Sequence, residues 1–258
     1  MAKKRILSYL QMGNVQNDYT VVFIHGATMT KNGMAMLAEH FSQYNCIVFD
    51  LPAHGESDGR EPKDILEFVE AIEESVEELR KVGKVRGKLI LAGYSMGGAI
   101  TCEIVIRRKL AVNGIVLLST GANLDKYTPL IDEIKKKPMS EFHTEDVFAH
   151  AFGQDTTEEQ VTGILKGLAE TMVSNEIGYQ DLLIANSYHR IEMLKKVKIP
   201  AMIVHGDDDE IILAKSAIDL WDSLKDSQLL MLPYRGHTAI FEETEVVVKE
   251  VSSFINKL

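Results

Sequence analysis

A serine between two glycines stands where an apolar run gives way to a helical pattern. Residues 93–97 read Gly-Tyr-Ser-Met-Gly with Ser95 at the centre, they follow the apolar residues 89–92, and helical periodicity begins at Met96. Glycines at these two places permit a sharp strand-to-helix turn that raises a serine hydroxyl into solvent at a helix N-terminus. The helix dipole and the free N–H of Met96 favour the negative charge that develops during acyl transfer. The segment therefore predicts that Ser95 is a nucleophile in acyl transfer.

A histidine near the end of the chain is the predicted base for this serine. A serine hydroxyl is a weak nucleophile at neutral pH and needs a base that takes its proton. His237 follows the last apolar run, so it would emerge at the same edge of a sheet as Ser95. His25 and His205 also end apolar runs, but a glycine follows each, which is typical of turns where an imidazole bonds to the backbone. The remaining histidines lie in helical patterns or in a loop: His40, His54, His143, His150 and His189.

Several carboxylates after the next-to-last apolar run offer an acid partner for this histidine. A base in such a site needs a carboxylate that fixes its tautomer and stabilises the imidazolium. The residues that follow Gly206 are Asp207, Asp208, Asp209 and Glu210. Asp209 is the predicted acid, because the third place after the glycine lets the turn finish before the side chain points inward. Asp207 and Asp208 are expected to shape the turn or to stay solvated.

A second glycine turn could complete an oxyanion site. His25, Gly26 and Ala27 follow the apolar residues 21–24, and Gly26 allows the chain to pass close to a reacting centre. The backbone N–H of Ala27 can then face that of Met96, and two such donors stabilise a tetrahedral oxyanion. Ala27 and Met96 are thus the predicted oxyanion hole, with a plain strand-to-loop turn as the alternative.

Apolar runs alternate with helical patterns along the chain and would position these side chains. The runs are continuous, which is typical of strands that helices cover on both faces. They span residues 21–24, 46–49, 89–92, 114–118, 201–204 and 229–232. The helical patterns span residues 31–42, 62–82, 96–109, 214–225 and 242–256. This alternation predicts right-handed crossovers and a parallel sheet, so the expected fold class is α/β.

The interval 125–196 interrupts this alternation. It contains no convincing strand, and its helical patterns span residues 130–137, 145–151, 158–172 and 176–193. Ligands bind at the carboxyl ends of the strands in such sheets, and the interval begins and ends there, so it is predicted to form a helical cap or lid. The expected division is a core of residues 1–124 and 197–258 and a lid of residues 125–196. Ordinary packing helices are the alternative.

The predicted lid carries apolar side chains that could contact a substrate. The candidates are Met29, beside the oxyanion turn, and the lid residues Tyr127, Phe148, Phe152, Met172 and Tyr179. Each of them could equally be a packing residue of the lid. Together they indicate a pocket for a small or medium apolar acyl group.

Charge and composition exclude several classes of protein. The 258 residues carry 28 Lys and Arg against 38 Asp and Glu, a formal net charge of −10. A nucleic-acid binder needs a basic face, and an anionic membrane surface disfavours an acidic protein, so neither partner is expected. No apolar run approaches the roughly 18 residues of a membrane span, and the stretch after the basic residues 1–5 is too short for a signal peptide. Cys46 and Cys102 are expected to be core residues of a cytoplasmic protein.

The order Ser95, Asp209, His237 resembles the nucleophile–acid–base order of the α/β-hydrolase superfamily. The resemblance spans essentially the whole chain and is to the lidded branch of esterases and lipase-like enzymes. The matching segments are residues 25–26, 50–57 (Asp-Leu-Pro-Ala-His-Gly-Glu-Ser), 93–97, 206–209 and 236–237. Two departures stand out: Ala53 occupies a place where the family has glycine, and only residues 1–20 precede the first apolar run, so one edge strand is expected to be missing.

This resemblance implies a serine hydrolase that cleaves a small-molecule ester through an acyl-enzyme. It requires no cofactor and no metal; the histidines form no His-Glu-x-x-His pattern, and residues 207–210 lack the spacing of a calcium loop. A carbon–carbon bond hydrolase, a thioesterase, a lactonase or a lyase could use the same triad. A non-catalytic small-molecule receptor on the same scaffold is the alternative from another class. Ser95 argues against the aspartate nucleophile of a dehalogenase or epoxide hydrolase, and the sequence leaves a homodimer open.

Overall fold

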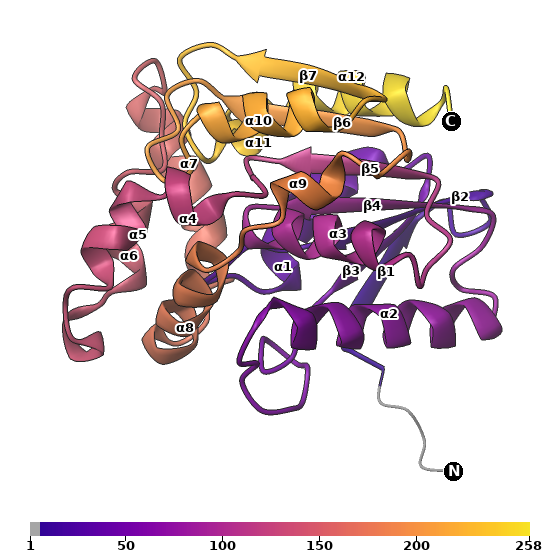
Figure 1. Ribbon diagram of the computed structural model, residues 1–258, viewed down its shortest axis with the longest axis horizontal. Helices are drawn as coiled ribbons and strands as arrows, with labels where there is room; N and C mark the ends of the chain where they lie inside the picture. Colours follow the sequence, from indigo (N-terminus) through magenta and orange to yellow (C-terminus); the bar gives the residue numbers. More distant parts are fainter. Residues whose placement is uncertain (1–5) are drawn as a thin grey trace.

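A twisted sheet forms the centre of the molecule in the computed structural model, which describes residues 6–258 (Figure 1). The basic residues 1–5, considered above for a signal peptide, lie outside the described residues. The described strands form one 7-stranded sheet of order β1-β3-β2-β4-β5-β6-β7, in which only the β1–β3 pair is antiparallel. They are β1 (Tyr9–Gly13), β2 (Tyr19–Ile24), β3 (Asn45–Phe49), β4 (Lys88–Tyr94), β5 (Gly114–Leu118), β6 (Ala201–Gly206) and β7 (Ser227–Leu232). The predicted α/β class with a mostly parallel sheet is confirmed.

Burial explains why three of the strands can be recognised in the sequence. Every residue of β3, β5 and β6 is buried, so each reads as a continuous apolar run. Strand β1 is different, because its residues are only partly buried at the edge of the sheet. This strand is absent from the predicted ones, since its short mixed sequence lacks an apolar run. The residues before β2 thus supply one antiparallel edge strand.

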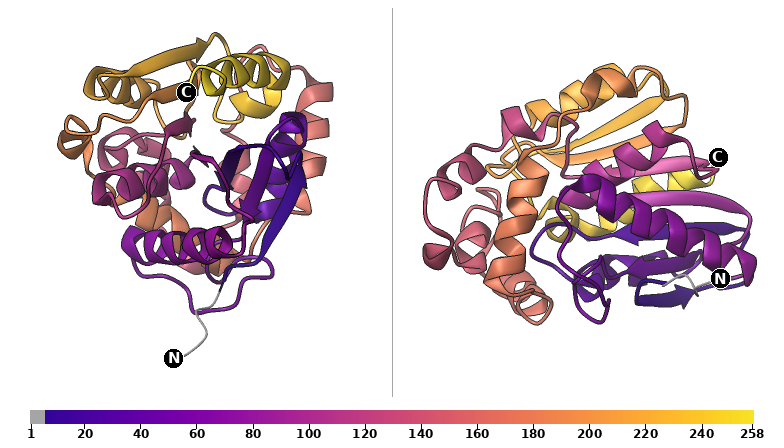
Figure 2. Two further views of the ribbon diagram at one scale, coloured as in Figure 1. Left: turned by 90° about the vertical axis from the view of Figure 1, so that its right-hand side faces the viewer. Right: turned by 60° about the horizontal axis from the view of Figure 1, so that its bottom comes forward.

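Helices cover both faces of the sheet. Figure 1 shows α2, α3, α9 and α10 in front of the sheet and α1 and α12 behind it, and the turned views of Figure 2 show the same separation. Their bounds are α1 (Lys31–Ala38), α2 (Ile65–Lys81), α3 (Met96–Arg107), α9 (Ile191–Leu194), α10 (Lys215–Ser223) and α12 (Thr244–Ile255). In α2 the Asp64 side chain caps the N-terminus by accepting from Glu67 N at 3.1 Å, and the buried residues Phe68, Ile72 and Val76 recur on one face.

The parallel register brings the carboxyl ends of the strands level with one another. Ile24 of β2 pairs with Gly93 of β4, and Tyr94 pairs with Leu118 of β5. On the other side, Gly206 of β6 pairs with Leu232 of β7. Side chains that follow β2, β4, β6 and β7 therefore emerge along one edge, where open α/β sheets bind ligands.

A helical insertion of residues 119–200 connects β5 to β6 beyond this edge (Figure 1). Besides α9 its elements are α4 (Leu124–Tyr127), α5 (Pro129–Ile134), η2 (Met139–Glu141), α6 (Thr144–Phe148), α7 (Glu158–Ala169) and α8 (Asn175–Asn186). The helix predicted over residues 176–193 is in fact two, because α8 ends at Asn186 and Tyr188 N–H then bonds to Ala185 O in a turn before α9. Two further short elements complete the fold, η1 (Glu39–Phe41) and α11 (Ala239–Glu242).

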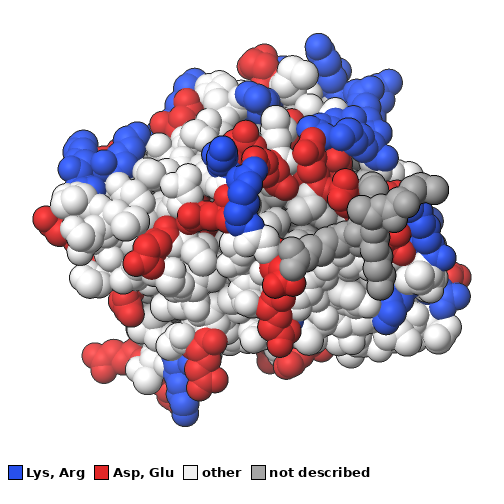
Figure 3. All heavy atoms as spheres, turned by 90° about the horizontal axis from the view of Figure 1, so that it is seen from below, with Lys and Arg blue, Asp and Glu red and all other residues white. Residues whose placement is uncertain are grey.

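The surface carries mixed charge. On the face seen in Figure 3, acidic and basic side chains are interspersed, and neither sign forms a continuous field. Over residues 6–258, no helix combines the length and apolarity needed to cross a membrane. Cys46 and Cys102 are buried free thiols, and burial raises the pKa of Cys46 to about 12.

Candidate active site

Ser95 sits on a tight turn between β4 and α3. Its backbone is in the positive-φ region (φ 53°, ψ −120°), which few residues other than glycine adopt without strain. The flanking glycines have a visible reason. A Cβ on Gly93 would collide with the carbonyl oxygen of Gly97, and a Cβ on Gly97 would collide with that of Ile24 at the end of β2. The turn can therefore form only because both positions lack a side chain.

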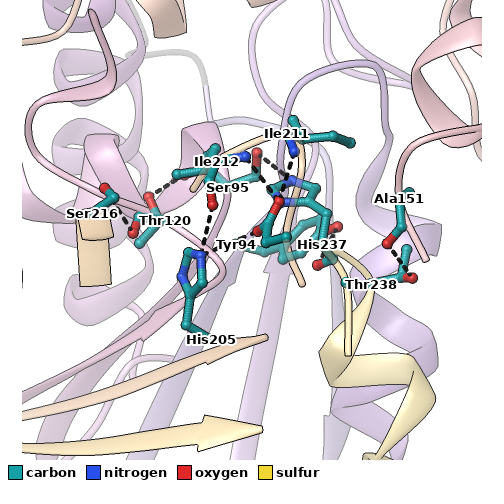
Figure 4. Close-up of polar contacts among 12 residues, drawn as sticks. Tyr94, Ser95, Thr120, Ala151, His205, Ile211, Ile212, Ser216, His237 and Thr238 are labelled. Carbon is teal, nitrogen blue, oxygen red and sulfur yellow. Dashed lines mark hydrogen bonds and ion pairs between the residues drawn. The ribbon is translucent and has the colours of Figure 1, made fainter. Parts of the chain in front are cut away.

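Three side chains from separate strand ends meet at this turn, and Figure 4 labels two of them, Ser95 and His237. The Oγ of Ser95 lies 3.0 Å from Nε2 of His237, and Nδ1 of His237 lies 2.8 Å from Oδ2 of Asp209. All three are largely buried, with exposed fractions of 9% for Ser95, 6% for His237 and 3% for Asp209. The carboxylate accepts from Nδ1–H, so Nε2 is free to accept the serine proton.

The carboxylate of Asp209 is surrounded by donors. Its Oδ1 accepts from the N–H groups of Ile211 and Ile212 at 2.9 and 2.8 Å, and its Oδ2 also lies 3.2 Å from Nε2 of His205. Burial by itself would raise the pKa of Asp209. The charge of His237 and hydrogen bonds from His205 and His237 outweigh burial and hold this pKa well below its usual range. Asp209 is therefore ionised at any pH near neutrality.

Further contacts fix the loop that carries His237. Glu242 accepts from the N–H of Gly236 at 3.1 Å and from the hydroxyl of Thr238 at 2.9 Å, on both sides of the histidine. The hydroxyl of Tyr94 donates to the carbonyl oxygen of His237 at 3.3 Å, and the two rings lie 5.2 Å apart. Glu242 is absent from the predicted site residues, and its spacing four residues after Thr238 is the signal in the sequence that points to it.

The predicted oxyanion turn lies directly against Ser95. A Cβ built on Gly26 would lie 3.0 Å from Cβ of Ser95, so the backbone after β2 passes close to the hydroxyl. Ala27 follows at once, and Met96 is the first residue of α3. The Ser95 carbonyl oxygen accepts from Thr120 Oγ1 at 2.6 Å. Both predicted backbone donors thus belong to segments that border the serine.

The neighbouring titratable side chains have other partners. His25 donates from Nδ1 to Gly26 O at 2.8 Å and accepts at Nε2 from Leu51 N at 3.1 Å, so it is neutral. Burial, followed by the charge of His54, lowers its pKa well below the usual value. His205 bonds to the carbonyl oxygen of Ile212 at 2.8 Å, as expected for a turn histidine.

The other carboxylates after β6 shape turns and contacts with the insertion. Asp207 Oδ1 accepts from Tyr234 N at 2.5 Å, and Asp208 Oδ2 accepts from Gln154 N at 3.2 Å. Glu210 pairs with His150 at 3.1 Å on the surface. Among these neighbours, only Asp209 reaches His237.

An apolar cavity of about 440 Å³ lies in the insertion. Its lining consists of Glu145, Phe148, Ala149, Phe152, Val161, Leu165, Ala169 and Met172. Two contacts tie it to the segments that flank Ser95. The backbone at Phe152 abuts Gly236, next to His237, and Met172 forms an antiparallel bridge with Met29 of the loop after Ala27.

Three of the predicted substrate contacts line this cavity, and three do not. Phe148, Phe152 and Met172 are among its walls, whereas Met29 is 2% exposed and belongs to the hydrophobic core. Tyr127 is directed elsewhere, because its hydroxyl bonds to Asp219 of α10 at 2.9 Å. Tyr179 packs its ring against Phe142 and donates to Lys137 O at 3.3 Å. Both tyrosines therefore lie outside the lining of this cavity.

No metal site accompanies these residues in the part of the chain that the structure describes. Within residues 6–258, no three side chains of His, Cys, Asp or Glu are grouped so that they could hold a metal ion.

The sheet, the turn at Ser95 and the positions of the three polar side chains define an α/β-hydrolase. The chain belongs to the family described as serine aminopeptidase, S33, which it matches over residues 15–244. The protein is accordingly an enzyme of the hydrolase type.

Relatives and solved structures agree with this family. The pimeloyl-[acyl-carrier protein] methyl ester esterase of Nitrosospira multiformis is 25% identical, over 91% of this chain and 93% of that protein. The 2-hydroxy-6-oxo-6-(2'-aminophenyl)hexa-2,4-dienoic acid hydrolase of Metapseudomonas resinovorans is 23% identical, over 96% of this chain and 87% of its own length. A lipase-esterase related protein of Clostridium acetobutylicum shares the fold with a TM-score of 0.85 and 23% identity, covering 96% of this chain and 99% of its own.

Proposed function

We propose that this protein is a serine hydrolase that cleaves carboxylic esters of small or medium apolar acyl groups through an acyl-enzyme on Ser95. The observation that carries the proposal is the hydrogen-bonded line from Ser95 Oγ through the His237 ring to the Asp209 carboxylate, with distances of 3.0 and 2.8 Å. The relative named as a methyl ester esterase supports the choice of bond.

The reaction begins with proton transfer from Ser95 to His237. The serine oxygen attacks the ester carbonyl, and the N–H groups of Ala27 and Met96 stabilise the resulting oxyanion. Asp209 stabilises the imidazolium, since it is a buried carboxylate kept ionised by its donors. His237 then returns the proton to the leaving alcohol. Water then attacks the acyl-enzyme while His237 takes its proton. The proton passes from His237 to Ser95 as the acid leaves, which restores the free enzyme.

The apolar cavity of the insertion is the proposed site for the acyl group. Its walls include the rings of Phe148 and Phe152 and the thioether of Met172, which suit an alkyl or aryl chain. Because Phe152 abuts the loop of His237 and Met172 abuts that of Ala27, a chain in this cavity extends between those two loops. In this proposal residues 125–196 act as the lid over a core of residues 1–124 and 197–258.

A fluorophosphonate probe and a series of p-nitrophenyl esters test the proposal together. The wild type should react with one equivalent of probe and should hydrolyse esters of short and medium acyl chains. Ser95→Ala should abolish labelling and lower kcat on the order of 10⁴–10⁶-fold. Ser187→Ala, which removes an exposed hydroxyl of the insertion, is the matched control and should retain both properties.

A comparison of substrates that contain other bonds shows which bond the enzyme cleaves best. Thioesters, lactones, β-diketones and amino-acid p-nitroanilides should each give a lower kcat/KM than the best ester. A higher kcat/KM for any of them would retain Ser95 as the nucleophile but refute the assignment as a carboxylic ester hydrolase.

A further inference from the structure

The loop that carries Ala27 is held by the insertion. After Ala27 the chain runs alongside the segment between α7 and α8, and Met29 forms an antiparallel bridge with Met172. Thr30 N–H donates to Thr171 O at 2.8 Å, and Val173 N–H donates to Thr28 O at 3.0 Å. Part of the predicted oxyanion turn is therefore built from contacts with residues more than a hundred positions away.

A buried carboxylate of α8 reaches the same loop. Thr28 has a positive φ of 67°, a backbone conformation that a β-branched residue rarely adopts without support. Its N–H donates to Oδ2 of Asp181 at 3.2 Å. This N–H lies in the peptide plane that joins Ala27 to Thr28. The N–H of Ala27 lies in the preceding peptide plane, and the two planes meet at the Cα of Ala27, so a shift at Thr28 turns the backbone of Ala27 as well. Asp181 has no exposed surface, so water does not compete for this bond.

His54 holds this carboxylate in place. Its Nε2 lies 2.8 Å from Oδ2 of Asp181, and its Nδ1 lies 2.9 Å from the carbonyl oxygen of Pro52. Both neighbours are acceptors, so the ring meets both only when each nitrogen carries a proton. The buried imidazolium then balances the buried carboxylate.

The surroundings of His54 fit this charge. The titratable groups that face it are Asp181 from α8, Asp50 and Glu61 from the loops on either side, and His25 from the end of β2. Burial would lower the pKa of His54, but the charge of Asp181 and the hydrogen bond to it raise this pKa above its usual value. His25 is the only other cation former in this group, and it is neutral.

We infer that Asp181, held by His54, is a positioning residue that fixes the peptide of Thr28 and thereby aims the N–H of Ala27 at the oxyanion. The inference rests on the proposed function, since it concerns the oxyanion of that reaction. Asp181 does not touch the reacting atoms. In the described part of the chain its Oδ1 is buried without a hydrogen-bond partner, so a single oxygen, Oδ2, serves both Thr28 and His54.

Because one oxygen of Asp181 serves both Thr28 and His54, variants can separate its role as an acceptor from its charge. Asp181→Asn retains one oxygen that can accept from Thr28, so it preserves the acceptor while removing the charge. The double variant His54→Phe, Asp181→Leu removes the acceptor and also replaces both charged partners by apolar groups, which avoids an unpaired buried charge and favours folding. Asp125→Ala breaks another His–Asp pair, that with His189 on the surface, and is the matched control.

The readout is kcat per active site, with sites counted by fluorophosphonate, together with the affinity for a boronic acid that mimics the tetrahedral intermediate. In the double variant we expect kcat and boronic-acid affinity to fall together by about 10–10²-fold, up to the cost of one lost oxyanion donor, while KM changes less than about 3-fold. Asp181→Asn should recover most of the loss. A purely structural role would lower only the number of titrated sites.

The inference is overturned if the double variant keeps wild-type kcat and boronic-acid affinity per titrated site. It is also overturned if Asp181→Asn loses as much as the double variant, because the acceptor would then not be the deciding feature. A wild type that neither reacts with the probe nor hydrolyses esters would instead refute the proposed function, and this role with it.

Discussion

Asp209 is the residue on which the chemistry of His237 depends most. Two backbone N–H groups bind one of its oxygens and two histidines approach the other, so the carboxylate is oriented from several directions. The neighbouring carboxylate of Asp208 accepts a hydrogen bond from Gln154 N of the insertion instead. The two aspartates are adjacent in sequence but have separate tasks, and substitution by asparagine distinguishes them.

We expect Asp209→Asn to lower kcat for ester hydrolysis by about 10³–10⁴-fold, because an amide at this place favours the wrong tautomer of His237 and cannot stabilise its charge. Asp208→Asn should stay within about 3-fold of the wild type, since it contacts neither Ser95 nor His237. Steady-state kinetics on a p-nitrophenyl ester measure both. A loss in Asp208→Asn with near-normal activity in Asp209→Asn would reverse the assignment.

Ala53 shows what the departure from the family's glycine costs. Its φ is +66°, the left-handed conformation that favours glycine. The left-handed conformation costs an L-residue roughly 1–2 kcal/mol in the folded state. Glycine removes this cost, but it also makes the unfolded chain more flexible, which lowers the free energy of unfolding by about 0.4–1 kcal/mol. Ala53→Gly should therefore raise the free energy of unfolding by about 0.5–1 kcal/mol.

Chemical denaturation measures this effect, and the same substitution elsewhere provides the control. Ala71→Gly lies inside α2 and should destabilise by about 1 kcal/mol, since glycine weakens a helix interior. An Ala53→Gly variant less stable than the wild type would show that this loop gains nothing from glycine.

At the scale of elements, α8 and the loop after β3 are joined by the buried pair of Asp181 and His54. Because Asp181 raises the pKa of His54 above its unfolded value, the pair stabilises the fold fully below the pKa of an unfolded histidine, about 6.5. This contribution is lost as the pH rises through the higher folded pKa. The direction is opposite to that of a carboxylate whose pKa is lowered.

Comparison of the wild type with His54→Gln across pH tests this linkage. The difference in unfolding free energy should be largest near pH 6 and should decline at higher pH, with a slope no steeper than about 1.4 kcal/mol per pH unit for one proton. His189→Gln, at the exposed pair with Asp125, should show a much smaller pH dependence. A difference that grows with pH would contradict a protonated His54.

At the scale of the whole molecule, most strands and helices of the α/β core could be predicted from the sequence, because they depend on local patterns. The apolar residues 89–92, the glycines of 93–97 and the helical period after Met96 correspond to β4, the turn and α3. Strand β1 lacked such a signal, since Gln11 interrupts its apolar residues and no continuous apolar run remains. The split between α8 and α9 depends on a turn that the amphipathic pattern does not reveal.

The residues of the site also fall into those that the sequence predicts and those that it does not. Ser95 and His237 stand in short motifs, so sequence alone points to them. The partnership of His54 with Asp181 spans 127 positions and joins a loop to a helix of the insertion, so it depends on the tertiary structure. The directions of Tyr127 and Tyr179 likewise follow from their partners in α10 and the insertion rather than from their residue type.

The central claim for the molecule is that a covalent acyl intermediate forms on Ser95. Intact-mass spectrometry of enzyme quenched during turnover of a p-nitrophenyl ester measures it directly. We expect a species heavier by one acyl group, located on the peptide that contains Ser95 and absent from Ser95→Ala. Turnover of the ester by Ser95→Ala at the wild-type rate, with no acylated species in either protein, would contradict it.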